Sequence, residues 1–146
     1  MRVRFEQVAS EREEEAVIRA VNKTADVQMA IDLLENGSGT IPVLKDGSTM
    51  LVRIQAIYYA ESVDKKTFIY TKEGCYETKS RLYELEEELD QFFIRCSKAM
   101  IINLRKIRSV KNDIGGRMSA TLLNGEIVVI SRSYVKELKE RLERIF

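Results

Sequence analysis

The residues best suited to chemistry lie in one segment, residues 92–107, where apolar and basic side chains are interleaved. Apolar side chains such as Phe93, Met100 and Ile107 can hold the segment in a core. The basic side chains between them cannot follow, because an unpaired buried charge costs several kcal/mol or more. An apolar anchor that fixes cations on one surface is what a phosphate-lined groove requires. The alternative is an ordinary strand and turn whose basic residues are simply solvated.

The charge of the chain is unevenly distributed. The formal net charge is only +1, yet the stretch between residues 95 and 117 carries a single anion, Asp113, among many cations. Those cations are Arg95, Lys98, Arg105, Lys106, Arg108, Lys111 and Arg117. Acidic blocks at residues 11–15 and 84–90 balance them arithmetically without having to share their surface. A near-neutral total therefore conceals a basic patch.

The composition excludes several classes of function. The chain has no histidine and only two cysteines, Cys75 and Cys96, which removes most zinc sites, histidine-based acid–base chemistry and the usual nucleophilic triads. We therefore expect no enzyme, no metal, no cofactor and no small-molecule substrate. No apolar run approaches the ~18–20 residues needed to cross a bilayer, and two distant cysteines without a signal peptide indicate reduced thiols. We expect a soluble, cytoplasmic protein.

The order and spacing of the residues in the 92–107 segment are more informative than its composition. It resembles the signature of the LytTR family of DNA-binding domains, an aromatic-x-Arg-x-x-x-Ser/Ala-x-x-Val/Ile-Asn-x-x-x-Ile run. The residues in register are Phe93, Arg95, Ala99, Ile102, Asn103 and Ile107. Further landmarks of the family match in order at residues 57–62, 123–126 and 131–134. The resemblance covers residues 40–146.

The sequence pattern of the first 38 residues predicts a small, separate unit. Residues 1–8 alternate apolar and polar side chains, which predicts a half-buried strand. Residues 16–21 are rich in β-branched side chains and predict a second strand, although a helix is the open alternative. From Thr24, a plausible N-cap, the spacing becomes helical, and residues 36–39 form the linker. This β-β-α unit is too small for a receiver domain, and we interpret it as a packing or dimerisation unit rather than a ligand sensor.

Residues 39–146 predict an α+β domain dominated by antiparallel β-hairpins with short helices. Hairpins are expected around Asp46-Gly47, around residues 72–74, and around Asn124-Gly125 with a type I′ turn. Pro42 places the first strand at a sheet edge. A short helix over residues 81–89 is expected to be capped by Ser80, and the last helix to start at Ser131 or Ser133.

Candidate DNA contacts are cations and polar groups on loops and strand ends. Lys98, Arg117 and Arg132 are the main candidates, with the turn at Lys66 and Thr67 as a fourth place. Family resemblance implies that DNA is bound by such loops rather than by a recognition helix, and the contact positions align with these places. Arg95, Arg105 and Lys106 are phosphate contacts or solvated cations.

Two further residues of the basic segment have open interpretations. Asn103 matches a family landmark but is more typical of a residue that satisfies backbone groups at a turn. Cys96 is either a redox-sensitive thiol whose pKa neighbouring cations depress, or a small residue at the edge of the core.

The resulting hypothesis is a sequence-specific regulator of transcription that binds double-stranded DNA, as a homodimer on repeated half-sites. The alternative is a protein-interaction module that docks a membrane-bound partner and has no direct DNA role. Family resemblance also implies that a membrane-bound inhibitory protein can restrain such a regulator. RNA binding is a third possibility, but it requires exposed aromatic residues on a sheet, and the aromatic residues here lie in apolar strands.

Overall fold

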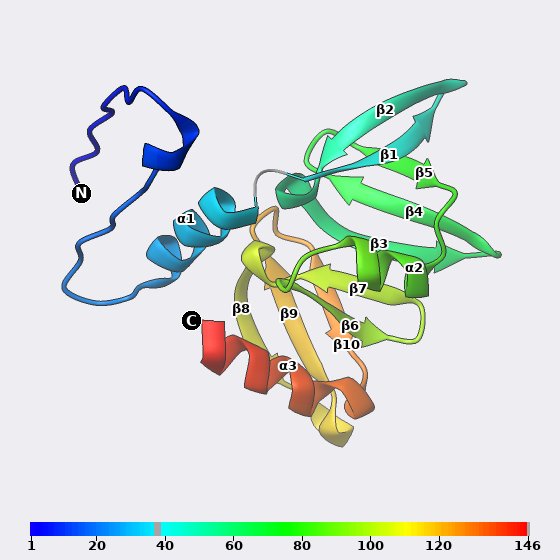
Figure 1. The fold of residues 1–146 in the computed structure, drawn as a ribbon. Coiled ribbons are helices and arrows are strands. Elements are labelled where there is room, and N and C mark those ends of the chain that lie inside the picture. The colour runs from blue at the N-terminus through cyan, green and yellow to red at the C-terminus, as the bar shows by residue number, and fades with distance from the viewer. Residues whose placement is uncertain (37–38, 146) are drawn as a thin grey trace. The chain divides into compact units, whose positions relative to one another are not determined.

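The computed structural model describes residues 1–36 and 39–145 of the chain (Figure 1). The chain divides into two units, Met1–Gly37 and Ser38–Phe146. The linker predicted over residues 36–39 lies partly outside the described residues. Among the described residues, no helix is both long and apolar enough to cross a membrane.

The first unit lacks the two strands that its sequence pattern predicts. Residues 1–8 and 16–21 form no strand, and the described part of the unit contains a 3₁₀ turn (Glu11–Glu13) and α1 (Ala25–Asn36). The predicted β-β-α arrangement is therefore wrong in its strands. Between the two segments, the Glu13 carboxylate accepts the backbone N–H groups of Ala9 and Ser10, at 3.1 and 3.2 Å, and the chain forms a helical turn there and not a hairpin. Without a hairpin turn, residues 1–8 have no strand to pair with.

Helix α1 begins where the sequence predicts. The Thr24 hydroxyl accepts the N–H of Val27 at 3.3 Å, so Thr24 caps the helix. Within the helix, the Gln28 amide donates to the Asp32 carboxylate at 3.1 Å, one turn further on.

The second unit is an α+β domain of antiparallel strands, which confirms the predicted fold class. One sheet has seven strands in the order β2-β1-β5-β4-β3-β7-β6, and the other has three in the order β10-β9-β8. The strands are β1 (Thr40–Lys45), β2 (Ser48–Arg53), β3 (Ile57–Val63), β4 (Lys66–Thr71), β5 (Cys75–Thr78), β6 (Phe93–Ser97), β7 (Met100–Asn103), β8 (Ile107–Asn112), β9 (Met118–Leu122) and β10 (Ile127–Ile130). The helices are α2 (Leu82–Glu88) and α3 (Arg132–Ile145).

The hairpin turns show how far local sequence determines this fold. Asp46 and Gly47 both have positive φ, 49° and 78°, as a two-residue type I′ turn requires. At the third hairpin only Gly125 is left-handed, with φ 88°, and its N–H donates to the Leu122 carbonyl at 2.9 Å. This turn is therefore a longer loop closed by a left-handed glycine, and the predicted type I′ turn is wrong.

Pro42 does not lie on the edge strand. β2 is the edge, and β1 lies between β2 and β5. The ladder between β1 and β5 is limited to Leu44 opposite Glu77, and the Pro42 carbonyl accepts the Thr78 hydroxyl at 3.4 Å. Pro42 is accommodated because the ladder on that side does not extend to it.

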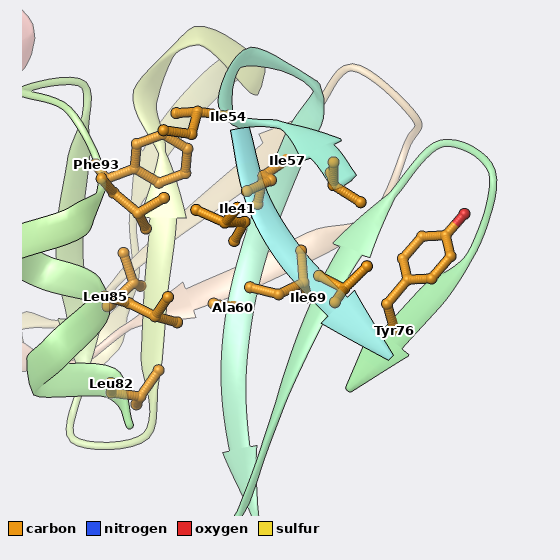
Figure 2. Close-up of a cluster of buried hydrophobic side chains, with 13 residues drawn as sticks. Ile41, Ile54, Ile57, Ala60, Ile69, Tyr76, Leu82, Leu85 and Phe93 are labelled. Atoms are coloured by element: carbon orange, nitrogen blue, oxygen red, sulfur yellow. The ribbon is translucent and has the colours of Figure 1, made fainter. Parts of the chain in front are cut away.

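Two hydrophobic clusters cover opposite faces of strands β6 and β7. The first includes Phe93 and Ile101 together with Leu82, Leu85 and Leu89 from α2 and its end (Figure 2). The second unites the other faces of β6 and β7 with the three-stranded sheet and α3; it contains Ile94, Cys96, Ile102, Leu104, Met118, Ala120, Leu122, Val128, Ile130 and Leu138. Consecutive residues of a strand point to opposite faces, so the β6–β7 hairpin is held from both sides.

The Asn103 side chain forms hydrogen bonds with backbone groups in the interior, as the sequence analysis predicts for it. The side chain is fully buried; its amide donates to the Ile57 carbonyl at 2.7 Å and its oxygen accepts the Arg105 N–H at 3.0 Å.

An Asn103→Asp variant keeps the shape but turns the donor into an oxygen that faces the carbonyl. We expect it to lower the free energy of unfolding by about 2 kcal/mol or more in urea titrations. Asn112→Asp, at an exposed position on β8, is the control, and equal losses in both variants would contradict this role.

Candidate nucleic-acid interface

Two backbone hydrogen bonds bring three loops of the second unit together. The Ser62 N–H, near the end of β3, donates to the Ala99 carbonyl at 2.8 Å, and the Ser131 N–H, just before α3, donates to the Cys96 carbonyl at 2.8 Å. The β6–β7 turn, which contains Lys98, therefore lies between the β3–β4 turn and the start of α3.

A fourth loop joins this group through a glycine. Gly116, in the 3₁₀ turn Ile114–Gly116 between β8 and β9, has φ +80°. A Cβ at this position would lie 3.2 Å from Cγ of Arg132. The loop thus packs directly on the Arg132 side chain at the first residue of α3, and Arg117 follows immediately.

These four loops form a surface that we call the loop rim, defined by Lys66, Lys98, Arg117 and Arg132. Each of the four residues is exposed, and among the described residues none of them takes part in an ion pair. In Figure 1 the turns that carry them follow one side of the domain, from the β3–β4 turn past the β6–β7 turn to the start of α3. The predicted sites Lys66, Lys98, Arg117 and Arg132 therefore come together as available positive charges.

Arg95 makes contacts within the protein. Its guanidinium forms an ion pair with Glu86 of α2, and its Nη1 donates to the Lys98 carbonyl at 2.6 Å. Two of its donors, Nε and Nη1, are thus directed at protein groups, and a phosphate contact of Arg95 stays a prediction.

Arg105 and Lys106 lie away from the loop rim, and their contact with phosphates stays a prediction. The Arg105 side chain is only 9% exposed, paired with Asp90 and stacked 4.0 Å from the Phe92 ring. The Lys106 ammonium lies 5.0 Å from the Tyr58 ring, and burial, followed by the nearby Arg105, lowers its pKa. Both follow the end of β7 opposite to the β6–β7 turn. Sequence spacing alone could not show at which end of the strand they lie.

Thr67 leaves the contact set. It follows Lys66 on β4, but its side chain is 5% exposed and faces inward. Neighbours in a strand point to opposite faces, so Lys66 can be presented to solvent while Thr67 is not.

The acidic residues of α2 make specific contacts within the protein. Glu84 accepts the Arg81 N–H at 3.0 Å and thereby caps the helix, a role predicted for Ser80. Ser80 instead donates its hydroxyl to Glu88 at 3.2 Å. Glu86, which the sequence did not single out, reaches Arg95.

An open groove of about 450 Å³ lies along β6, lined by residues of α2, β6, β7 and α3. Its charged side chains pair with each other: Glu86 with Arg95, and Glu137 with Arg141 at 3.9 Å. Paired charges of this kind stabilise the walls of a groove and leave few groups available for chemistry.

Comparison with known proteins identifies the domain. The model of the LytTr DNA-binding domain matches residues 47–143. In structure, the chain is similar to a LytTr DNA-binding domain from Bacillus cereus, with a TM-score of 0.69 and 28% identity over 73% of this chain and 98% of that one.

Several relatives extend the similarity. The chain is 29% identical to the sensory transduction protein LytT of Enterococcus faecalis, covering 89% of this chain and 56% of LytT. It is 29% identical to an uncharacterised HTH-type transcriptional regulator of Staphylococcus aureus, over 92% of both chains. It is 33% identical to the transcriptional regulatory protein YpdB of Escherichia coli K12, over 69% of this chain and 42% of YpdB.

The antiparallel α+β fold and these matches define a DNA-binding domain that is similar to those of transcriptional regulators. The chain belongs to the LytTR family of DNA-binding domains.

The two adjacent glycines of the β8–β9 loop provide a test of the Arg132 position. Gly115 has φ +84° and Gly116 has φ +80°. A Cβ at Gly115 would meet nothing within 4 Å, whereas a Cβ at Gly116 would crowd the Arg132 side chain. Alanine at either position costs about 1–2 kcal/mol of backbone strain. We expect Gly116→Ala to weaken DNA binding, measured by fluorescence anisotropy, several-fold more than Gly115→Ala. Equal affinities of the two variants would show that the packing of Gly116 against Arg132 has no part in binding.

Cys96 is a core residue in this structure. Its side chain is fully buried, and burial raises its pKa to about 12 despite the neighbouring Arg95. Of the two interpretations of Cys96, the structure supports a small residue of the core over a thiol activated by cations. We predict that a thiol reagent at pH 8 labels the exposed Cys75 of the native protein rapidly and Cys96 only after unfolding, as measured by mass spectrometry of labelled peptides. Rapid labelling of Cys96 in the native state would contradict this assignment.

Proposed function

We propose that the protein recognises specific duplex DNA sequences through the loop rim, with Lys98, Arg117 and Arg132 entering the grooves and Lys66 contacting the phosphate backbone. The observation that carries this proposal is the convergence, on one side of the domain, of four exposed cations that form no ion pair with any described residue and that lie in or beside four separate connections. Arginine is suited to guanine, because its planar fork meets O6 and N7 together.

The helices support this proposal by their charge. α2 carries Glu84, Glu86, Glu87 and Glu88, and an acidic surface is repelled by phosphates. The exposed side of α3 mixes acidic and basic residues along its length. The contribution of α3 is confined to its first turn, where Arg132 lies next to backbone N–H groups that favour a phosphate.

Two copies on repeated half-sites fit the size of this surface. A single small DNA-binding module buries roughly 600–1,000 Å² of protein surface, and specific complexes reach about 1,000–2,500 Å². We therefore propose that a homodimer, with one such module in each copy, binds two half-sites.

The N-terminal unit is a candidate for contacts between the copies. Val3 and Phe5 are 93% and 87% exposed in a segment with the alternation of a strand and no strand partner among the described residues. A second copy can supply the missing backbone pairing.

The cytoplasmic location, the lack of catalysis and the membrane-bound partner remain predictions. A function in the cytoplasm agrees with DNA as the ligand, and catalysis is not expected of a chain whose relatives are named as regulators. A membrane-bound inhibitory protein stays an implication of the family resemblance. The match to DNA-binding domains does not favour a protein-interaction module that lacks a DNA role.

Selection of bound sequences from a random pool of duplex DNA tests the proposal and supplies a ligand for the variants. We expect an enriched motif that occurs twice, with centres about one helical turn, 10–10.5 bp, or a multiple of it apart. An unenriched pool would contradict specific recognition, and a single motif would contradict binding by two copies.

On the selected duplex, Arg132→Ala is expected to cost about 1–3 kcal/mol of binding free energy if Arg132 reads a base. Lys66→Ala is expected to reduce the slope of log K against log salt by roughly one unit, because it removes a phosphate contact. Lys139→Ala, which removes an exposed cation from α3, is the control. Undiminished binding by Arg132→Ala would remove Arg132 from the contact set.

A further inference from the structure

The turn that presents Lys98 is fixed by hydrogen bonds on several sides. The Ala99 carbonyl accepts the Ser62 N–H at 2.8 Å, and the Ala99 N–H donates to the Ser97 hydroxyl at 3.3 Å. The Lys98 carbonyl accepts Nη1 of Arg95 at 2.6 Å. This last bond comes from a charged donor, and such bonds are shorter and stronger than those between neutral groups.

Arg95 is itself held in place by α2. Its Nε contacts the Glu86 carboxylate while Nη1 contacts the Lys98 carbonyl, so two edges of one planar group make the two contacts. Because the guanidinium is rigid, fixing one edge fixes the other. Glu86 thereby acts on the β6–β7 turn although it lies on another element.

The presence of Glu86 requires an explanation in a protein that binds DNA. A carboxylate near the binding surface repels phosphates. The adjacent Glu87 is exposed and makes no ion pair or side-chain hydrogen bond among the described residues. Only Glu86 of this pair is directed toward β6.

We propose that Glu86 and Arg95 are positioning residues that hold the β6–β7 turn in the conformation in which Lys98 meets DNA. This inference rests on the proposed function. It reverses the effect expected from simple electrostatics: neutralising an acidic residue on a DNA-binding protein should strengthen binding, whereas neutralising Glu86 weakens it because the turn loses its support.

The matched pair Glu86→Gln and Glu87→Gln tests this inference, since each removes one negative charge from the same helix. On the duplex selected above, at fixed salt, Glu86→Gln weakens binding about fivefold, because its amide oxygen accepts only a neutral-acceptor bond in place of the charge-assisted one. Glu87→Gln binds equally well or slightly more tightly. An equal or greater affinity of Glu86→Gln than of Glu87→Gln would overturn the inference.

A double-mutant cycle with Lys98→Met separates positioning from general destabilisation. If Glu86 acts through the turn, Glu86→Gln causes no further loss of affinity in the Lys98→Met background. A fivefold loss that persists in that background would overturn the inference, because Glu86 would then act independently of Lys98.

Hydrogen exchange of the free protein provides a readout that does not depend on DNA. Amides of residues 97–99 exchange faster in Glu86→Gln than in wild type and remain unchanged in Glu87→Gln. Unchanged exchange in Glu86→Gln would overturn the inference whether or not the wild type binds DNA. Conversely, a wild type that binds no duplex, together with faster exchange in Glu86→Gln, would overturn the proposed function and leave the support of the turn intact.

Discussion

The structure depends on the burial of the β6–β7 hairpin from both sides. Phe93 and Ile101 belong to the cluster under α2, whereas Ile94 and Ile102 belong to the cluster under α3 and the three-stranded sheet. A slip of one residue would exchange the two faces along the whole hairpin, so its register is fixed. The hydrogen bonds at Cys96 and Ala99 then place two neighbouring loops relative to this hairpin, and the loop rim follows from that arrangement.

Features set by nearby residues could be predicted from the sequence. The Asp46-Gly47 turn, the cap at Thr24 and the buried leucines of α2 follow from local turn chemistry and helical spacing, and the family motif supplied the fold. Features that need a distant partner could not. The alternation of residues 1–8 shows which side chains would share a face but provides no strand to pair with. Arg105 resembled a surface cation because Asp90, its partner, is adjacent only in the folded chain.

The arrangement of helices separates this domain from helix-turn-helix proteins, although one of its relatives carries that label in its name. In the second unit, strands precede and follow α2, and α3 comes after β10, so no two described helices there are consecutive in the chain. An acidic α2 and an α3 of mixed charge are poor candidates for insertion into a groove. Rigid sheets instead position short connections, and the exposed cations of the proposed interface lie in or beside these connections.

The separation of the four rim cations onto four connections also bears on evolution. The strands and the helix that flank the four connections are anchored in the two hydrophobic clusters, so a side chain in one connection can change while the backbone of the others is retained. Under the proposed function, preference for one base position can thus diverge without a concerted change at the rest. Paralogues with unlike operators can arise from such a scaffold by single replacements, and the same property makes it a convenient starting point for engineered regulators that do not cross-react.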